Sequence, residues 1–160
     1  MKIPYVDLSY KNKSKKELIK VFKKVLDKGQ FVGGDEIDLF EKKIAKLCGT
    51  NYAVALNSGT DALTLALHLL GVRKGDEVIT PPNSFIASTA VIVHLGAKPV
   101  FVDVLSDQNI DPNKIQSAIT KKTKVIMPVH LSGRMSQMDK IMSIAKKNKI
   151  SVVEDAAQSV

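Results

Sequence analysis

The sequence predicts an α/β protein in which helices cover both faces of a mainly parallel sheet. The main observation is that, from residue 52 onward, short apolar runs alternate with longer segments of helical periodicity. The short runs are almost continuously apolar, which is typical of parallel strands buried on both faces. With 160 residues and 44% hydrophobic content, the chain is long enough for one domain with a sizeable core.

Two amphipathic helices are predicted before this alternation begins. The first should begin at a capping box formed by Ser14 and Glu17, continue through Leu26 and end at Gly29. The second should place its apolar residues on one face and end at Gly49.

Five strands are predicted after these helices, with one helix between each pair of successive strands. The strands are expected at residues 52–56, 77–80, 99–104, 123–129 and 150–154. The helices are expected at residues 57–71, 84–96, 111–119 and 136–148. The first of these four helices is nearly all apolar, so we expect it to be buried on most sides. Helical crossovers between strands make the sheet mainly parallel.

Composition excludes several classes of function. The 24 Lys and Arg against 16 Asp and Glu give a net charge of +8. These basic residues are spread over helix faces, helix ends and turns, so we expect a solvated surface and no nucleic-acid partner. No signal peptide and no apolar run of roughly 18 residues is present, which predicts no membrane partner and a cytoplasmic location. A single Cys48 and the lack of a His/Cys cluster predict no disulfide and no metal site.

Polar and aromatic residues follow the predicted strands, at the sheet edge where parallel sheets bind ligands. Ser58, Gly59 and Thr60 follow the first strand and open a helix, whose free N–H groups and dipole suit a phosphate. A simple N-cap is the alternative for this turn. Phe85 follows the second strand and is either a stacking surface for a planar ring or a core residue at a helix start.

The later strands deliver further candidates to the same edge. His130 and Arg134 follow the strand at 123–129 and are candidates for substrate contact, although a histidine hydrogen-bonded inside the structure is the favoured alternative for His130. Asp155 and Gln158 follow the last strand, and no role is assigned to Glu154. Burying a carboxylate beside a strand costs free energy unless a cation accompanies it, so Asp155 raises the question of what its partner is.

The segments "SGTDAL", "GDEVITPPNSF" and "EDAAQ" occur in this order, together with "GQFVGGDEIDLFEKKIA" and "TKVIMPVHLSG". This combination resembles the N-terminal part of DegT-type nucleotide-sugar aminotransferases, from about Ile3 to Val160. The resemblance implies part of the large domain of the type I fold of PLP-dependent transferases. It implies an N-terminal arm and helix in residues 1–30 and an incomplete PLP-binding large domain in residues 31–160. The rest of the large domain and the small C-terminal domain are expected outside this chain.

The resemblance also implies pyridoxal 5′-phosphate (PLP) as the cofactor. The family's cofactor-binding positions match Ser58, Gly59, Thr60, Phe85, Asp155 and Gln158. By this match the turn at Gly59 and Thr60 binds the phosphate, Phe85 stacks on the ring, and Gln158 lies near the ring hydroxyl. Asp155 pairs with the protonated pyridine nitrogen, so that the ring can withdraw electrons during the reaction.

The implied activity is transfer of an amino group from glutamate or a similar donor to a keto group of a nucleotide-linked sugar, by a homodimer. The lysine that forms the Schiff base is expected a few tens of residues beyond Val160. No catalytic residue is therefore expected within the chain, which should be inactive alone. Two alternatives stay open: a deoxysugar 3-dehydratase, with histidine in place of that lysine, and a truncated, non-catalytic remnant that binds a cofactor or a partner.

Overall fold

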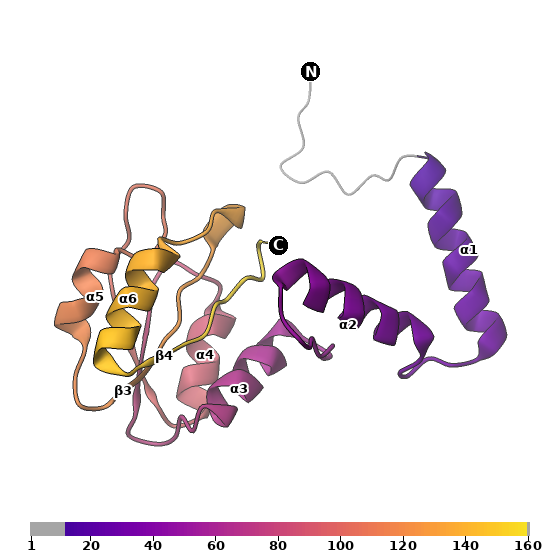
Figure 1. Ribbon diagram of the computed structural model, residues 1–160. Helices are drawn as coiled ribbons and strands as arrows, with labels where there is room; N and C mark the ends of the chain where they lie inside the picture. The colour runs from indigo at the N-terminus through magenta and orange to yellow at the C-terminus, as the bar shows by residue number, and fades with distance from the viewer. Residues whose placement is uncertain (1–11, 160) are drawn as a thin grey trace. The chain divides into compact units, whose positions relative to one another are not determined.

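The structure is a computed structural model that describes residues 12–159 (Figure 1). The predicted N-terminal arm falls on residues 1–11, which lie outside the described residues, as does Val160. The chain divides into two compact units, the first ending at Ala55 and the second beginning at Leu56. None of the helices in residues 12–159 combines the length and the hydropathy that crossing a bilayer requires.

The first unit contains the two predicted amphipathic helices, α1 (Asn12–Lys28) and α2 (Asp35–Cys48). The predicted capping box at Ser14 is wrong, because α1 is already helical at Asn12 and a capping residue has to lie outside the helix. Both predicted helix ends are confirmed. Gly49 ends α2 in the left-handed conformation, with φ 65°, and its N–H points to the carbonyls of the last turn.

Ion pairs link the end of α1 to the start of α2. Lys28 Nζ lies 3.0 Å from Asp35 Oδ2, and Lys24 Nζ lies 3.0 Å from Glu36 Oε1. The hydrogen bond to Asp35 raises the pKa of the Lys28 ammonium group and lowers the pKa of the Asp35 carboxyl group. These groups face solvent, so their contribution to stability is small and is screened by salt.

The second unit is an α/β sandwich around a parallel sheet. Its strands are β1 (Glu77–Thr80), β2 (Lys98–Phe101), β3 (Thr123–Ile126) and β4 (Ser151–Val152). Its helices are α3 (Gly59–Leu69), α4 (Ile86–His94), α5 (Pro112–Ala118), the short 3₁₀ helix η1 (Leu131–Gly133) and α6 (Met138–Asn148). The strand order is β2-β1-β3-β4, and every neighbouring pair is parallel. This confirms the predicted fold class.

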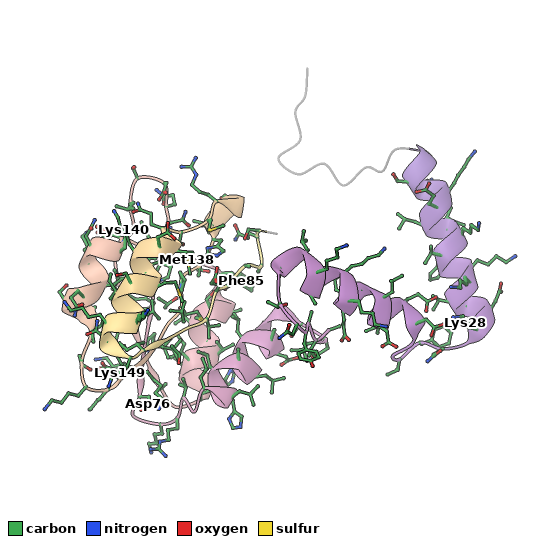
Figure 2. All side chains as sticks on the ribbon, in the orientation of Figure 1. Lys28, Asp76, Phe85, Met138, Lys140 and Lys149 are labelled. Atoms are coloured by element: carbon green, nitrogen blue, oxygen red, sulfur yellow. The ribbon has the colours of Figure 1, made fainter. Side chains whose placement is uncertain are left out.

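Helices cover both faces of this sheet, with α3 and α4 on one side and α5 and α6 on the other (Figure 1). The two ends of α6 can be located in Figure 2 from the labels at Met138 and Lys149. Val78 of β1 packs in the cluster with α3 and α4, whereas its neighbour Ile79 packs in the cluster with α5 and α6. Both residues are fully buried, as expected for a strand covered on both faces.

One predicted strand is absent from the described structure. Residues 52–56 belong to no helix or strand and pair with no other strand in residues 12–159. Tyr52 and Val54 are 85% and 75% exposed. A strand needs a hydrogen-bonding neighbour as well as an apolar sequence, so the prediction of five strands is wrong and the described sheet has four.

The prediction that α3 is buried on most sides is also wrong. Leu67 is fully buried against α4 and the sheet, but Leu65 and Leu69 are 44% and 81% exposed. Only one side of α3 packs against another element of the described second unit. The apolar composition of α3 therefore does not determine how much of its surface is buried.

Candidate functional site

A cavity of about 170 Å³ lies in the second unit, at the carboxyl ends of the strands and beside α3 and α4. Every lining residue follows a strand, opens one of these two helices or lies in its first turns. The lining consists of Gly59, Thr60, Leu63, Ser84, Phe85, Ala87, Ser88, Val129, Asp155, Ala157 and Gln158. Five of the six sequence-predicted cofactor residues are therefore brought together at one cavity, and Ser58 is the exception.

Asp155 is the buried charged residue of the cavity, with 7% of its surface exposed. A bridge between Val129 and Asp155 extends the pairing of β3 with β4, so the backbone fixes the position of this residue. Its Oδ2 accepts a hydrogen bond from Ser88 Oγ at 2.7 Å, and its Oδ1 accepts one from the Ala157 N–H at 3.2 Å. Across residues 12–159, no Lys, Arg or His side chain forms an ion pair with it.

The start of α3 forms a second wall of the cavity. Gly59 and Thr60 occupy the first two helical positions, where helix geometry provides no acceptor for the backbone N–H groups. Ser58 is the N-cap: its Oγ accepts the Asp61 N–H at 3.1 Å and lies 3.0 Å from Asp61 Oδ2. The Ser58 hydroxyl thus caps the helix, as the alternative proposed. Gly59 and Thr60 line the cavity, and their backbone N–H groups donate to no acceptor within residues 12–159.

Phe85 and Gln158 complete the set of predicted residues at the cavity. Phe85 precedes α4 and is 71% exposed, so it is no core residue and its ring is available to a ligand (Figure 2). Gln158 Oε1 accepts the Ser132 N–H at 2.6 Å, which ties the chain end to η1. Gly133 adopts φ 82° there, and a Cβ at this position would approach Gln158 O to 3.2 Å, so the contact favours glycine.

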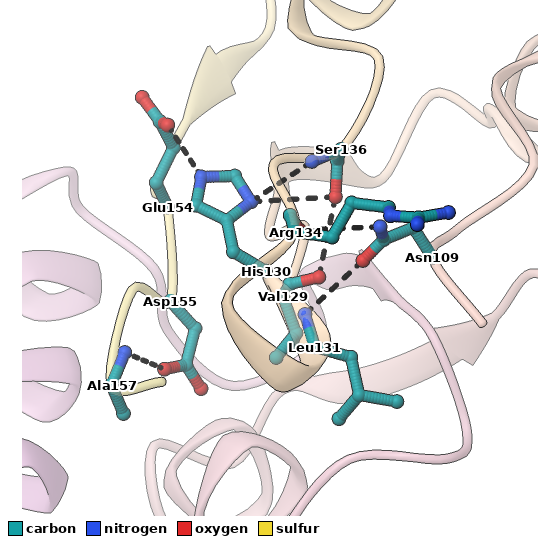
Figure 3. A network of polar contacts seen from close by, with 9 residues as sticks. All are labelled: Asn109, Val129, His130, Leu131, Arg134, Ser136, Glu154, Asp155 and Ala157. Carbon is teal, nitrogen blue, oxygen red and sulfur yellow. Dashed lines mark hydrogen bonds and ion pairs between the residues drawn. The ribbon is translucent and has the colours of Figure 1, made fainter. Parts of the chain in front are cut away.

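The two predicted substrate residues lie outside the cavity lining. His130 is buried, and both of its ring nitrogens have partners (Figure 3). The Ser136 N–H donates to Nδ1 at 3.3 Å, so Nδ1 carries no proton, and Nε2 then donates to Glu154 Oε2 at 2.8 Å. Arg134 is exposed, and its carbonyl accepts from Asn109 Nδ2 at 3.2 Å. This geometry favours the structural alternative for His130.

Replacing His130 with alanine is expected to lower the free energy of unfolding by about 1–3 kcal/mol, because the buried Ser136 N–H loses its acceptor. Urea denaturation followed by circular dichroism measures this change. Glu154→Gln is the matched control: its side chain is half exposed and can still accept from Nε2, so a change within about 0.5 kcal/mol is expected. Unchanged stability in His130→Ala would contradict the structural role.

Sequence analysis missed the two serines at the start of α4. Ser88 is almost fully buried and contacts Asp155, and Ser84 Oγ lies 2.9 Å from Ser88 Oγ. The only signal in the sequence is their spacing of four residues, which would place both on one face of the helix predicted at residues 84–96, although α4 itself begins only at Ile86. The contact with Asp155 spans 67 residues and leaves no local pattern.

Comparison with known proteins places the chain in a family. The model of the DegT/DnrJ/EryC1/StrS aminotransferase family matches residues 12–160. The chain belongs to this family. Because similar solved structures are PLP-dependent aminotransferases, the α/β fold described above is part of the type I fold of those enzymes. The resemblance stated from the sequence is thereby confirmed.

Two curated family members and one solved structure illustrate the similarity. The dTDP-3-amino-3,6-dideoxy-alpha-D-galactopyranose transaminase of Aneurinibacillus thermoaerophilus is 43% identical, and the match covers 98% of this chain and 44% of that protein. The dTDP-3-amino-3,4,6-trideoxy-alpha-D-glucose transaminase of Streptomyces venezuelae is 39% identical, with coverage of 99% and 42%. The crystal structure of ntda from Bacillus subtilis with bound cofactor PMP superposes with a TM-score of 0.93 at 38% identity, covering 99% of this chain and 37% of that one. The chain thus spans less than half the length of these relatives.

Proposed function

We propose that the chain is the N-terminal portion of a PLP-dependent aminotransferase that acts on a keto group of a nucleotide-linked sugar, with glutamate or a similar amino acid as the amino donor. Membership of the family supports the reaction class. The two transaminases of dTDP-linked amino sugars described above support the substrate class.

The observation that carries this proposal is the buried Asp155 carboxylate without a cationic partner in the described part of the chain. An unpaired buried carboxylate is unfavourable, and a cationic ligand group relieves that cost. The protonated nitrogen of a pyridine ring is such a group. When bound, PLP supplies an electron sink for the carbon from which a proton is removed, and Asp155 strengthens it by keeping the nitrogen charged.

The other walls of the cavity fit the remaining parts of the cofactor. The free N–H groups of Gly59 and Thr60, at the positive end of the α3 dipole, suit a phosphate. The exposed ring of Phe85 suits a flat heteroaromatic ring. Gln158 lies in the lining with its Oε1 already bonded to Ser132, so its amide N–H groups are the donors that can reach a ring hydroxyl.

No lysine lines the cavity within the described residues, so this part of the chain brings no amine to it. We infer that the cofactor-binding lysine lies a few tens of residues after Val160 in a longer protein and that the 160 residues alone do not turn over substrate. The residue at that position separates two reactions that share the cofactor, since lysine specifies the transaminase and histidine specifies the deoxysugar 3-dehydratase. Reading the gene past the Val160 codon therefore decides between them.

Binding of pyridoxamine 5′-phosphate (PMP) to the 160-residue chain is expected to be saturable, with one site per chain, in a calorimetric titration. PMP is the better probe because PLP carries an aldehyde that reacts with exposed lysines, and Lys and Arg together number 24 in this chain. Pyridoxamine without its phosphate is the matched control. It should bind at least about tenfold more weakly, because it loses the charge-assisted hydrogen bonds at the start of α3.

Heat signals that do not saturate, or equal affinities for PMP and pyridoxamine, would contradict the cofactor site. In that case the non-catalytic interaction module becomes the better proposal. Its support is the exposed apolar surface on α3 and α4, where Leu69 is 81% and Ile86 is 68% exposed. The same surface supports a homodimer as the working form of the longer enzyme, and the free, exposed Cys48 fits a reducing compartment such as the cytoplasm.

A further inference from the structure

Two donors hold the Asp155 carboxylate, and they are not equivalent. Ser88 Oγ lies 2.7 Å from Oδ2, whereas the Ala157 nitrogen lies 3.2 Å from Oδ1 (Figure 3 shows the second contact). The shorter bond comes from a side chain that is 1% exposed and belongs to another secondary-structure element. Of the two donors, Ser88 therefore restricts the orientation of the Asp155 carboxylate more strongly than Ala157 does.

The hydrogen of the Ser88 hydroxyl group fixes the direction of a short chain of hydrogen bonds. A hydroxyl has one hydrogen, and that of Ser88 is donated to Asp155. Ser84 Oγ lies 2.9 Å from Ser88 Oγ and must then be the donor in their contact. The resulting sequence of donation runs from Ser84 to Ser88 to Asp155. Each donor polarises the next, which strengthens the bond to the carboxylate.

The backbones on both sides of this contact are fixed independently of it. Ser88 lies in the first turn of α4, whose next turn places Val91 and Ile92 in the core. The Asp155 N–H donates to Pro128 O at 2.9 Å, and the Asp155 carbonyl accepts the His130 N–H at 3.1 Å. Because neither backbone can shift freely, the hydroxyl selects the side-chain rotamer of Asp155.

We propose that Ser88 is a positioning residue that holds Asp155 in the cofactor-binding orientation before the cofactor arrives. The inference rests on the proposed function, because it names what prepares that site. A carboxylate already held in place loses no rotamer freedom when the ligand binds, and such preorganisation appears as affinity. Each carboxylate oxygen has one internal donor and keeps a further lone pair for a cationic ring nitrogen.

The test compares Ser88→Ala, Ser88→Thr and Thr80→Val in the 160-residue chain. Thr80→Val is the matched control, because the Thr80 hydroxyl is buried but has no hydrogen-bond partner in residues 12–159. Two quantities are measured: the affinity for PMP, and the carbon NMR signal of the Asp155 carboxyl group without cofactor. Ser88→Ala should weaken PMP binding about tenfold or more and move the Asp155 signal. Ser88→Thr should restore both, and Thr80→Val should leave both unchanged.

The Asp155→Asn background shows whether Ser88 acts through Asp155. Adding Ser88→Ala there should cause no further loss of affinity, since the carboxylate that it orients is gone. An equal loss in both backgrounds, or an Asp155 signal that does not move in Ser88→Ala, overturns the positioning role. If the unmodified chain does not bind PMP, the cofactor site fails, and the NMR signal alone then decides whether Ser88 orients Asp155.

Discussion

Replacing Asp155 with alanine is expected to lower the affinity of the chain for PMP by about a hundredfold or more. The reason is that the ring nitrogen of the ligand would enter a cavity with no opposite charge. Breaking a buried ion pair by removing one partner costs about 3–5 kcal/mol, which is far more than loss of an exposed pair. Calorimetric titration measures the affinity, and circular dichroism verifies that the variant is folded.

Two further variants separate charge from other effects. Asp155→Asn keeps the size of the side chain and removes its charge, so most of the loss should persist in it. Asp139→Ala makes the same chemical change in the first turn of α6, on the other face of the sheet, and should bind PMP normally. Normal binding in Asp155→Ala would refute the assignment of Asp155 to the ring nitrogen.

Replacing Ile141 with alanine is expected to lower the free energy of unfolding by about 2–5 kcal/mol. Ile141 is fully buried where α6 packs on the sheet, in the cluster with Ile79, Ile115 and Ile126. The substitution removes three side-chain carbons and leaves a cavity that the surrounding strands and helices cannot fill. Urea denaturation monitored by circular dichroism provides the measurement.

The adjacent residue on α6 provides the control. Met142 is 51% exposed, so Met142→Ala should change stability by no more than about 0.5 kcal/mol. The two variants carry the same replacement residue at adjacent positions of one helix, so they differ mainly in the burial of the side chain that is removed. Equal destabilisation by both would mean that α6 does not cover the sheet as described.

The parallel sheet was predictable because its strands are apolar on both faces. In β1, Val78 and Ile79 point to opposite layers and are both fully buried, so the run "EVIT" has no solvent-exposed side. The run "YAVAL" at residues 52–56 has the same character, yet it forms no strand in the described structure. A sequence window reports apolar content, while a strand also depends on a neighbour elsewhere in the chain.

The place of the site was predictable, but its internal contacts were not. The rule that ligands bind at the carboxyl ends of parallel strands pointed to Asp155 and Phe85, and both line one cavity. The same rule made His130 a candidate for substrate contact, although its ring nitrogens form hydrogen bonds with Glu154 and Ser136 outside the cavity lining. Position after a strand does not determine where a side chain points. Ser88 was missed because a serine within a helix is common and its partner is remote in sequence.

The sheet separates the cavity from the layer formed by α5 and α6. This separation allows fluorescent labels to be placed either near the cavity or away from it. A dye on Gln116, exposed on α5, would report on folding without approaching the cavity. A dye on Ile86, which is 68% exposed beside Phe85, would instead sense occupancy of the cavity. The native thiol at Cys48 is exposed and has to be replaced before either cysteine is introduced for labelling. One parent chain can then serve as both a folding reporter and a cofactor sensor.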